Sequence, residues 1–169
     1  MRILLIGGAP NTGKSNAVAM CANYLVDKGF NVVDCQDYNG EKIKLPKIVK
    51  GAKDSTEFLA ILKGKDLNKK IISIVLNTAS DTPILIDYNF DYLQKQNCDI
   101  YVSSIRDIGN ERKYLMKKFN FTNETPNLLG FPLAKVSRRN SNKVTAKAWY
   151  DTKVQNMLSY ILKSQPFEV

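Results

Sequence analysis

The stretch GGAPNTGKSN, residues 7–16, decides the fold of this chain. It holds the spacing Gly-x4-Gly-Lys-Ser, which begins at Gly8 and ends at Ser15. The apolar run RILLI (2–6) precedes it, and a segment with helical spacing follows it. Glycines between a strand and a helix allow backbone N–H groups and the positive end of the helix to converge on phosphate oxygens. The sequence therefore predicts a loop that holds a nucleoside triphosphate.

Two side chains of this loop have specific expected roles. Lys14 is predicted to reach the β- and γ-phosphates and to act in catalysis, and the Ser15 hydroxyl is predicted to ligate Mg²⁺. We expect ATP with Mg²⁺ as the cofactor, because the chain lacks the Asn/Thr-Lys-x-Asp guanine motif. The residues expected to contact the nucleotide are Gly8, Asn11, Thr12, Gly13, Lys14, Ser15 and Asn16.

Segments of strand and helix character alternate along the chain. The predicted strands cover residues 2–6, 30–35, 71–76, 99–105 and 127–136. The predicted helices run from the loop to about residue 29, over 54–64, from 81 or 82 to about 96, over roughly 109–119, and around 154–161. The alternation predicts an α/β fold, with a mainly parallel five-stranded sheet and helices on both faces. We expect one domain over residues 1–169.

The second of these helices rests on a short pattern. Asp54 and Glu57 have the spacing of a capping box, and Phe58, Ile61 and Leu62 would share one helical face. Gly64 stands where such a helix would end.

Composition narrows the chemistry. The chain has three cysteines without paired spacing and no histidine, which argues against a disulfide framework and against a Cys/His zinc site. A general base must then be Asp, Glu or Lys, and a metal is expected to be a hard, oxygen-bound ion such as Mg²⁺. The apolar start lacks a cleavage site and no apolar run approaches the length of a membrane span, so we expect a cytoplasmic protein without membrane contact.

The net charge of +9 allows two interpretations. Lys42, Lys44, Lys47, Lys50 and Lys53 fall in one short segment, which fits either a solvated basic face or weak binding of nucleic acid.

One aromatic pair also allows two interpretations. Trp149 and Tyr150 lie beside Lys143 and Lys147 and would either stack on a base or pack in the core.

Over residues 1–37 the chain resembles the P-loop NTPases, whose small kinases and ATPases share a five-stranded fold. The stretch GKSNAVAMCANYLVDKGFNVVDCQD is similar to the start of adenylylsulfate kinases and of ParA/MinD-type ATPases. The ParA-type loop carries an additional lysine near its start, where this chain has Ala9.

A second segment carries another resemblance. VSSIRDIGNERKYL (102–115) looks like a strand-end segment of phage-type deoxynucleoside monophosphate kinases. That resemblance implies that Arg106 contacts phosphate and that Glu111 orients it.

Acidic residues follow several predicted strands, at the edge where ligands bind to such sheets. A P-loop enzyme usually ends a second buried strand with an acid that holds Mg²⁺. Asn77 stands at that place, and Asp81 is the candidate, with a helix cap as its alternative role. Asp34 and Asp37 are candidates for accepting a proton from an acceptor hydroxyl.

Two arginines complete the candidates. Arg138 and Arg139 would neutralise charge on the transferred group, together with Arg106.

Two functions fit these patterns. The first is a P-loop phosphotransferase that uses ATP-Mg and acts on a nucleotide or another small phosphorylated acceptor. The alternative is a nucleotide-switched ATPase or binding module that acts on a protein or nucleic acid. The sequence makes no prediction of the oligomeric state.

Overall fold

The computed structural model describes residues 1–48, 57–107, 109–122, 124–135 and 143–169, and residues 143 and 144 only in their backbone. One six-stranded sheet organises these residues, in the order β2-β3-β4-β5-β1-β6. The strands are β1 Arg2–Gly8, β2 Asn31–Gln36, β3 Leu59–Lys65, β4 Ile71–Asn77, β5 Ile100–Arg106 and β6 Leu128–Pro132. The helices are α1 Lys14–Asp27, α2 Pro83–Gln94, α3 Glu111–Lys118 and α4 Lys143–Lys163.

All five predicted strands are present, and they run parallel to one another. β4, β5, β1 and β6 pair in parallel. β2 is antiparallel to β3, and β3 is antiparallel to β4, so β2 points the same way as β4. The predicted five-stranded sheet was incomplete, because β3 adds a sixth strand that runs against the others. The fold is therefore α/β with a mixed sheet.

The segment that becomes β3 was wrongly predicted as a helix. Leu59 and Ile61 lie in the core on one face of the sheet, whereas Phe58, Ala60 and Leu62 lie in the core on the other. This alternation has the period of two that a strand requires. A strand buried on both faces is apolar throughout, so its residues also match the helical spacing. Asp54, half of the expected capping box, lies outside the described residues.

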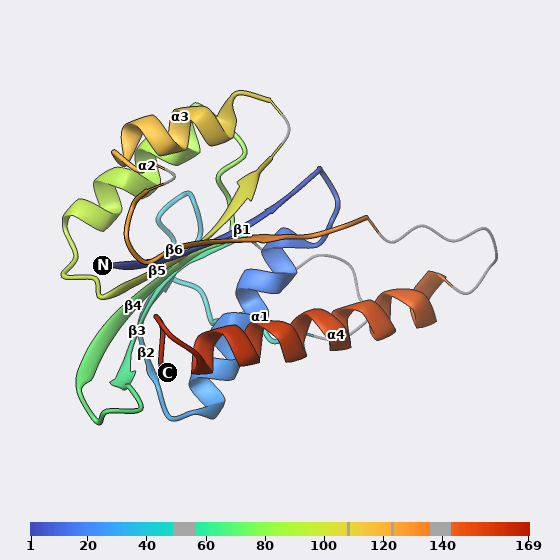
Figure 1. Ribbon diagram of the computed structural model, residues 1–169. Coiled ribbons are helices and arrows are strands. Elements are labelled where there is room, and N and C mark those ends of the chain that lie inside the picture. The colour runs from blue at the N-terminus through green and yellow to red at the C-terminus, as the bar shows by residue number, and fades with distance from the viewer. Residues whose placement is uncertain (49–56, 108, 123, 136–142) are drawn as a thin grey trace.

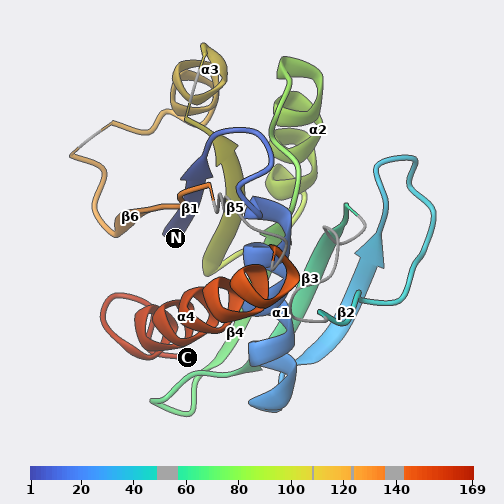
Figure 2. The ribbon, with the colours of Figure 1, turned by 90° about the vertical axis from the view of Figure 1, so that its right-hand side faces the viewer.

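Helices cover both faces of the sheet. Figure 1 shows α1 and α4 on one side of the strands and α2 and α3 on the other, and Figure 2 shows the same arrangement from a second direction. α1 packs on α4, and α2 packs on α3. α2 begins as predicted, because the Thr82 side chain accepts a hydrogen bond from the Leu85 N–H and Pro83 occupies the first turn. None of the described helices is long and apolar enough to cross a membrane.

The sheet direction places several strand ends together. β1, β4 and β5 end on one edge, here called the carboxyl edge, and β3 begins there because it runs the other way. Residues just before β3 therefore reach the same edge as residues that follow the parallel strands.

Candidate functional site

The loop between β1 and α1 has the backbone conformation that its glycines allow. Asn11 has a φ of 61° and Gly13 a φ of 84°, both in the left-handed region. Gly13 directly precedes α1, and a side chain there would be strained by that conformation. A Cβ at Gly8 would lie 2.5 Å from Thr12 Oγ1 and 3.1 Å from the Leu133 carbonyl oxygen. The loop can therefore fold this closely on itself only with a glycine at that position.

Polar side chains of the loop bond to backbone carbonyls. The Lys14 side chain is largely buried, and its Nζ donates to the Ala9 carbonyl at 3.1 Å. Thr12 Oγ1 donates to the same carbonyl at 2.9 Å. Ser15 Oγ donates to the Thr78 carbonyl at 3.1 Å, across to the residue that follows β4. The lysine and the serine are thus held on one side of the carboxyl edge.

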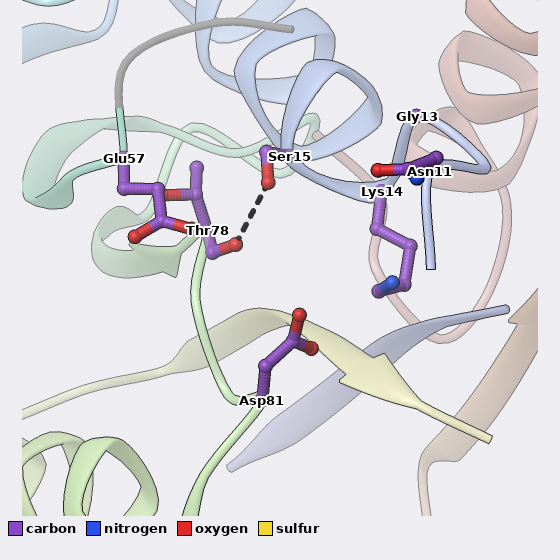
Figure 3. Close-up of a pocket in the computed structure, with 7 residues that line it drawn as sticks. All are labelled: Asn11, Gly13, Lys14, Ser15, Glu57, Thr78 and Asp81. Atoms are coloured by element: carbon purple, nitrogen blue, oxygen red, sulfur yellow. Dashed lines mark hydrogen bonds between the residues drawn. The ribbon is translucent and has the colours of Figure 1, made fainter. Parts of the chain in front are cut away.

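A pocket of about 150 Å³ opens at this place. Figure 3 shows Lys14 and Asp81 extending toward the space beside Ser15, with Glu57 and Thr78 on the far side. The lining carries one ammonium group and two carboxylates. Its residues are Asn11, Gly13, Lys14, Ser15, Glu57, Thr78 and Asp81.

The pocket thus brings together Asn11, Gly13, Lys14, Ser15 and Asp81 from the predicted site residues. The other three predicted nucleotide contacts do not line the pocket. Gly8 is the last residue of β1, and Asn16 is buried in the first turn of α1. The Thr12 hydroxyl donates to the Ala9 carbonyl within the loop.

Thr78 connects the parts of the site, and sequence reasoning missed it. Its carbonyl accepts hydrogen bonds from Ser15 Oγ and, at 2.8 Å, from Ser104 Oγ. Its hydroxyl donates to the Phe58 carbonyl at 2.9 Å and accepts from the Phe58 N–H at 2.6 Å. Thr78 therefore fixes α1, β5 and the start of β3 relative to one another.

Glu57 enters the pocket because of this arrangement. It directly precedes Phe58, whose backbone N–H and carbonyl both hydrogen-bond to the Thr78 hydroxyl. Partial burial, and then the charge of Asp81, raise the pKa of the Glu57 carboxyl above its ordinary value. A carboxylate with a raised pKa accepts a proton more readily, which suits a general base. The wrongly predicted helix over 54–64 concealed this candidate.

Asp81 and Arg106 form an ion pair beside the pocket. Arg106 Nη2 lies 3.3 Å from Asp81 Oδ2, and both side chains are about one-third exposed. Asp81 Oδ1 and Arg106 Nε are buried without a hydrogen-bond partner in the described part of the chain. Asp81 does not cap α2, since Thr82 does. Next to Ser15 and Lys14 it therefore presents a buried oxygen that no described residue hydrogen-bonds.

Asn77 occupies the end of β4, where the resemblance to P-loop enzymes predicts an acidic residue. Its side chain is fully buried, and its amide nitrogen donates to Ser80 Oγ at 2.7 Å, Ser103 Oγ at 2.9 Å and the Tyr101 hydroxyl at 3.2 Å. Its oxygen accepts from the Tyr38 hydroxyl and, at 3.0 Å, from the Ala79 N–H. Asn77 is thus a structural support under residues 78–81.

Asp34 and Asp37 do not line the pocket. Asp34 lies within β2, which β3, β4 and β5 separate from β1. Lys42 pairs with its carboxylate, and the Tyr92 hydroxyl donates to it at 3.0 Å. Burial alone would raise the pKa of Asp34, but these two hydrogen bonds hold that pKa below its ordinary value. The Asp34 carboxylate is thus already engaged by an ion pair with Lys42 and a hydrogen bond from Tyr92.

Asp37 has a local role in the chain. Its Oδ1 accepts from the Asn39 N–H at 2.8 Å and the Glu41 N–H at 2.9 Å. Its carboxylate therefore stabilises its own turn.

The other candidate charges are dispersed. Glu111 begins α3, and within the described residues no ion pair joins it to Arg106. Lys42 is committed to Asp34, while Lys44 and Lys47 are exposed. Arg138, Arg139, Lys50 and Lys53 lie outside the described residues.

Comparison of the chain with protein-family models, with curated proteins and with solved structures finds no match.

Proposed function

We propose that this chain is a P-loop phosphotransferase that binds ATP with Mg²⁺ at residues 7–16 and transfers the γ-phosphoryl group to a nucleotide or another small phosphorylated acceptor. One observation carries the proposal. Lys14, Ser15 and Asp81 face a single pocket at the start of α1, beside a loop with left-handed residues at 11 and 13. A cation, a hydroxyl and a carboxylate at a helix N-terminus are the groups that a metal-bound triphosphate requires.

The donor set fits Mg²⁺. Asp81 Oδ1 is a buried oxygen without a described partner, and the Ser15 hydroxyl lines the same pocket. The described residues hold no cluster of three or more His, Cys, Asp or Glu side chains around one point. Mg²⁺ commonly binds through one or two protein oxygens, water and substrate phosphates, so a small donor set suits it. The ion would neutralise charge on the phosphates.

The chain's own residues supply the remaining functions. Lys14 binds the phosphates and stabilises the charge that develops on the leaving diphosphate. Glu57 accepts the proton of the attacking hydroxyl while the new oxygen–phosphorus bond forms. The bond between the γ-phosphorus and its bridging oxygen breaks, and the nucleoside diphosphate leaves with that electron pair. Arg106 contacts a phosphate once it is released from Asp81.

A second candidate is a nucleotide-switched ATPase, in which water replaces the acceptor. The charge of the pocket favours it, because two carboxylates face one ammonium group. A phosphorylated acceptor would meet like charges there, whereas water would not.

One experiment tests both candidates. Titration calorimetry with ATP-Mg compares the wild type, Lys14→Ala and Lys113→Ala, a matched change at an exposed lysine on the opposite face of the sheet. We expect binding to the wild type and Lys113→Ala and a loss in Lys14→Ala. Equal affinity in all three proteins, or no binding by any, contradicts the P-loop proposal.

The fate of the phosphate then separates the two functions. With γ-labelled ATP and a panel of nucleoside monophosphates, label in an acceptor supports the phosphotransferase, and label released as phosphate supports the ATPase. In either case Arg106→Lys is expected to lower turnover on the order of 10²-fold with ATP affinity unchanged.

A further inference from the structure

The outer face of α4 carries large apolar side chains that the fold leaves uncovered. Trp149 is 61% exposed, Met157 53% and Tyr160 73%. Figure 2 shows α4 lying across the front of the molecule. These residues follow one another at helical spacing, together with the exposed Lys153 and Lys163. We call these five residues the α4 stripe.

The opposite face of α4 accounts for its packing. Ala146, Val154, Leu158 and Leu162 are buried and face the core. Tyr150 is partly buried, and its hydroxyl accepts from the Ala134 N–H at 3.0 Å. Of the two aromatic residues weighed as base-stacking candidates, Tyr150 therefore belongs to the packing and Trp149 does not. The helix is anchored without the stripe, so its exposed residues are not needed to hold α4 in place.

The exposed charged side chains described on α4 are all positive. The helix contains a single acid, Asp151, which is buried and lies 3.2 Å from Lys147 Nζ. Lys153 Nζ lies 5.8 Å from the centre of the Trp149 ring, which places a cation beside that aromatic surface. The chain as a whole carries a net charge of +9. A polyanion with flat apolar groups would complement this face.

We propose that the α4 stripe binds single-stranded nucleic acid. Trp149 and Tyr160 stack on bases, and Lys153 and Lys163 contact phosphates. Trp149 and Tyr160 are eleven positions apart in the sequence, so their backbone positions lie about 17 Å apart along the helix, a span that suits a strand of several nucleotides. This surface lies on α4, outside the pocket, and the proposal does not depend on ATP.

The arrangement favours nucleic acid over a protein partner. Lys153 interrupts the apolar residues, so Trp149 is separated from Met157 by two helical turns. A protein interface buries a contiguous apolar centre with a polar rim. Separate rings with cations between them form stacking platforms instead, because each base carries its own phosphate.

The chain contains its own probe for this proposal, since Trp149 is its one tryptophan. We expect a short single-stranded oligothymidylate to quench Trp149 fluorescence, with affinity that falls as salt rises by a log–log slope of about −0.7 per phosphate contacted. Heparin, which has charge but no bases, serves as the comparison and is expected to bind without quenching. Unchanged fluorescence with the oligonucleotide, or identical behaviour with heparin, overturns the stacking role.

Variants locate the surface. In anisotropy measurements with a labelled oligothymidylate, Trp149→Ala and Tyr160→Ala are each expected to weaken binding about 5- to 150-fold, the effect of one lost stacked base. The pair Lys153→Glu/Lys163→Glu should weaken it further. Lys113→Glu/Lys117→Glu, the same charge change at exposed residues of α3, is the control. An equal loss in both charge pairs shows diffuse attraction and overturns the assignment to α4.

Two further variants distinguish a lost stacking surface from a lost fold, and the α4 stripe from the pocket. Trp149→Phe keeps a ring and should retain most of the affinity, which separates a lost stacking surface from a lost fold. Lys14→Ala should bind the oligonucleotide as the wild type does. Failure at the phosphate loop and failure at α4 are therefore observed separately.

Discussion

Replacing Asn77 tests whether the buried polar network under the pocket determines stability. In Asn77→Ala, the hydroxyls of Ser80, Tyr101 and Ser103 lose a shared donor, and the Tyr38 hydroxyl loses an acceptor. Ser80 and Ser103 can still bond to each other, and Tyr38 retains the Phe58 carbonyl, so part of the loss is recovered. One or two buried polar groups remain unpaired, at about 1–3 kcal/mol each. We expect the free energy of unfolding to fall by about 2–4 kcal/mol.

A double-mutant cycle isolates one contact within that loss. Tyr101 is fully buried and stacks on Phe119, with ring centres 5.6 Å apart, so Tyr101→Phe keeps the packing and removes only the hydroxyl. The double variant Asn77→Ala/Tyr101→Phe should lose at least about 0.5 kcal/mol less than the two single losses added together.

Urea denaturation of the four proteins measures these values. Asn156→Ala, the same substitution at an exposed position of α4, should change stability by less than about 0.5 kcal/mol. Strict additivity in the cycle, or a loss at Asn77 no larger than at Asn156, would refute the reasoning.

The remaining predictions concern the charged residues. Glu57→Gln should slow phosphoryl transfer on the order of 10²-fold or more and leave ATP-Mg affinity intact; calorimetry beside a turnover assay checks this, and equal turnover excludes Glu57 as the base. Asp81→Asn should raise the Mg²⁺ concentration needed for half-maximal ATP binding, measured by titration of the metal, whereas an unchanged requirement removes Asp81 from the metal site. Because the folded pKa of Asp34 is lowered, its carboxylate stabilises the fold above its ordinary pKa of 3.8, and this contribution disappears as the pH falls through the folded value. Asp34→Asn should therefore be less stable than the wild type at pH 7 and equally stable in acid, as denaturation at the two pH values will show; Lys42→Ala should act in the same direction.

The sequence predicted the parallel strands and the loop between β1 and α1 because their signals are local. RILLI followed by glycines and a helical period identifies β1, the loop and α1 without knowledge of the rest of the chain. β3 was not predicted as a strand, because a strand buried on both faces does not alternate between apolar and polar residues. Its direction depends on pairing with β2 and β4, which is a property of the whole sheet.

The same limit explains which site residues were missed. Glu57 reaches the pocket only because β3 is reversed, and Thr78 acts through its backbone and a hydroxyl bonded to Phe58. Neither residue belongs to a sequence motif. Asp34 was a candidate because β2 directly follows α1 along the chain. In the sheet, however, β3, β4 and β5 lie between β2 and β1, and the order of strands along the chain does not reveal this arrangement.

The Thr78 carbonyl has a consequence for how mutational data on this protein should be interpreted. Because the acceptor for Ser15 and Ser104 belongs to the main chain, every side-chain substitution at position 78 retains it. A scan of position 78 would register only the hydroxyl bonded to Phe58, and it would attribute the whole position to β3. The links from Thr78 to α1 and to β5 become visible from their donors instead, through Ser15→Ala and Ser104→Ala. In a saturation library, the two hydrogen bonds to the Thr78 carbonyl would thus be recorded at the two serines and not at the residue that accepts them.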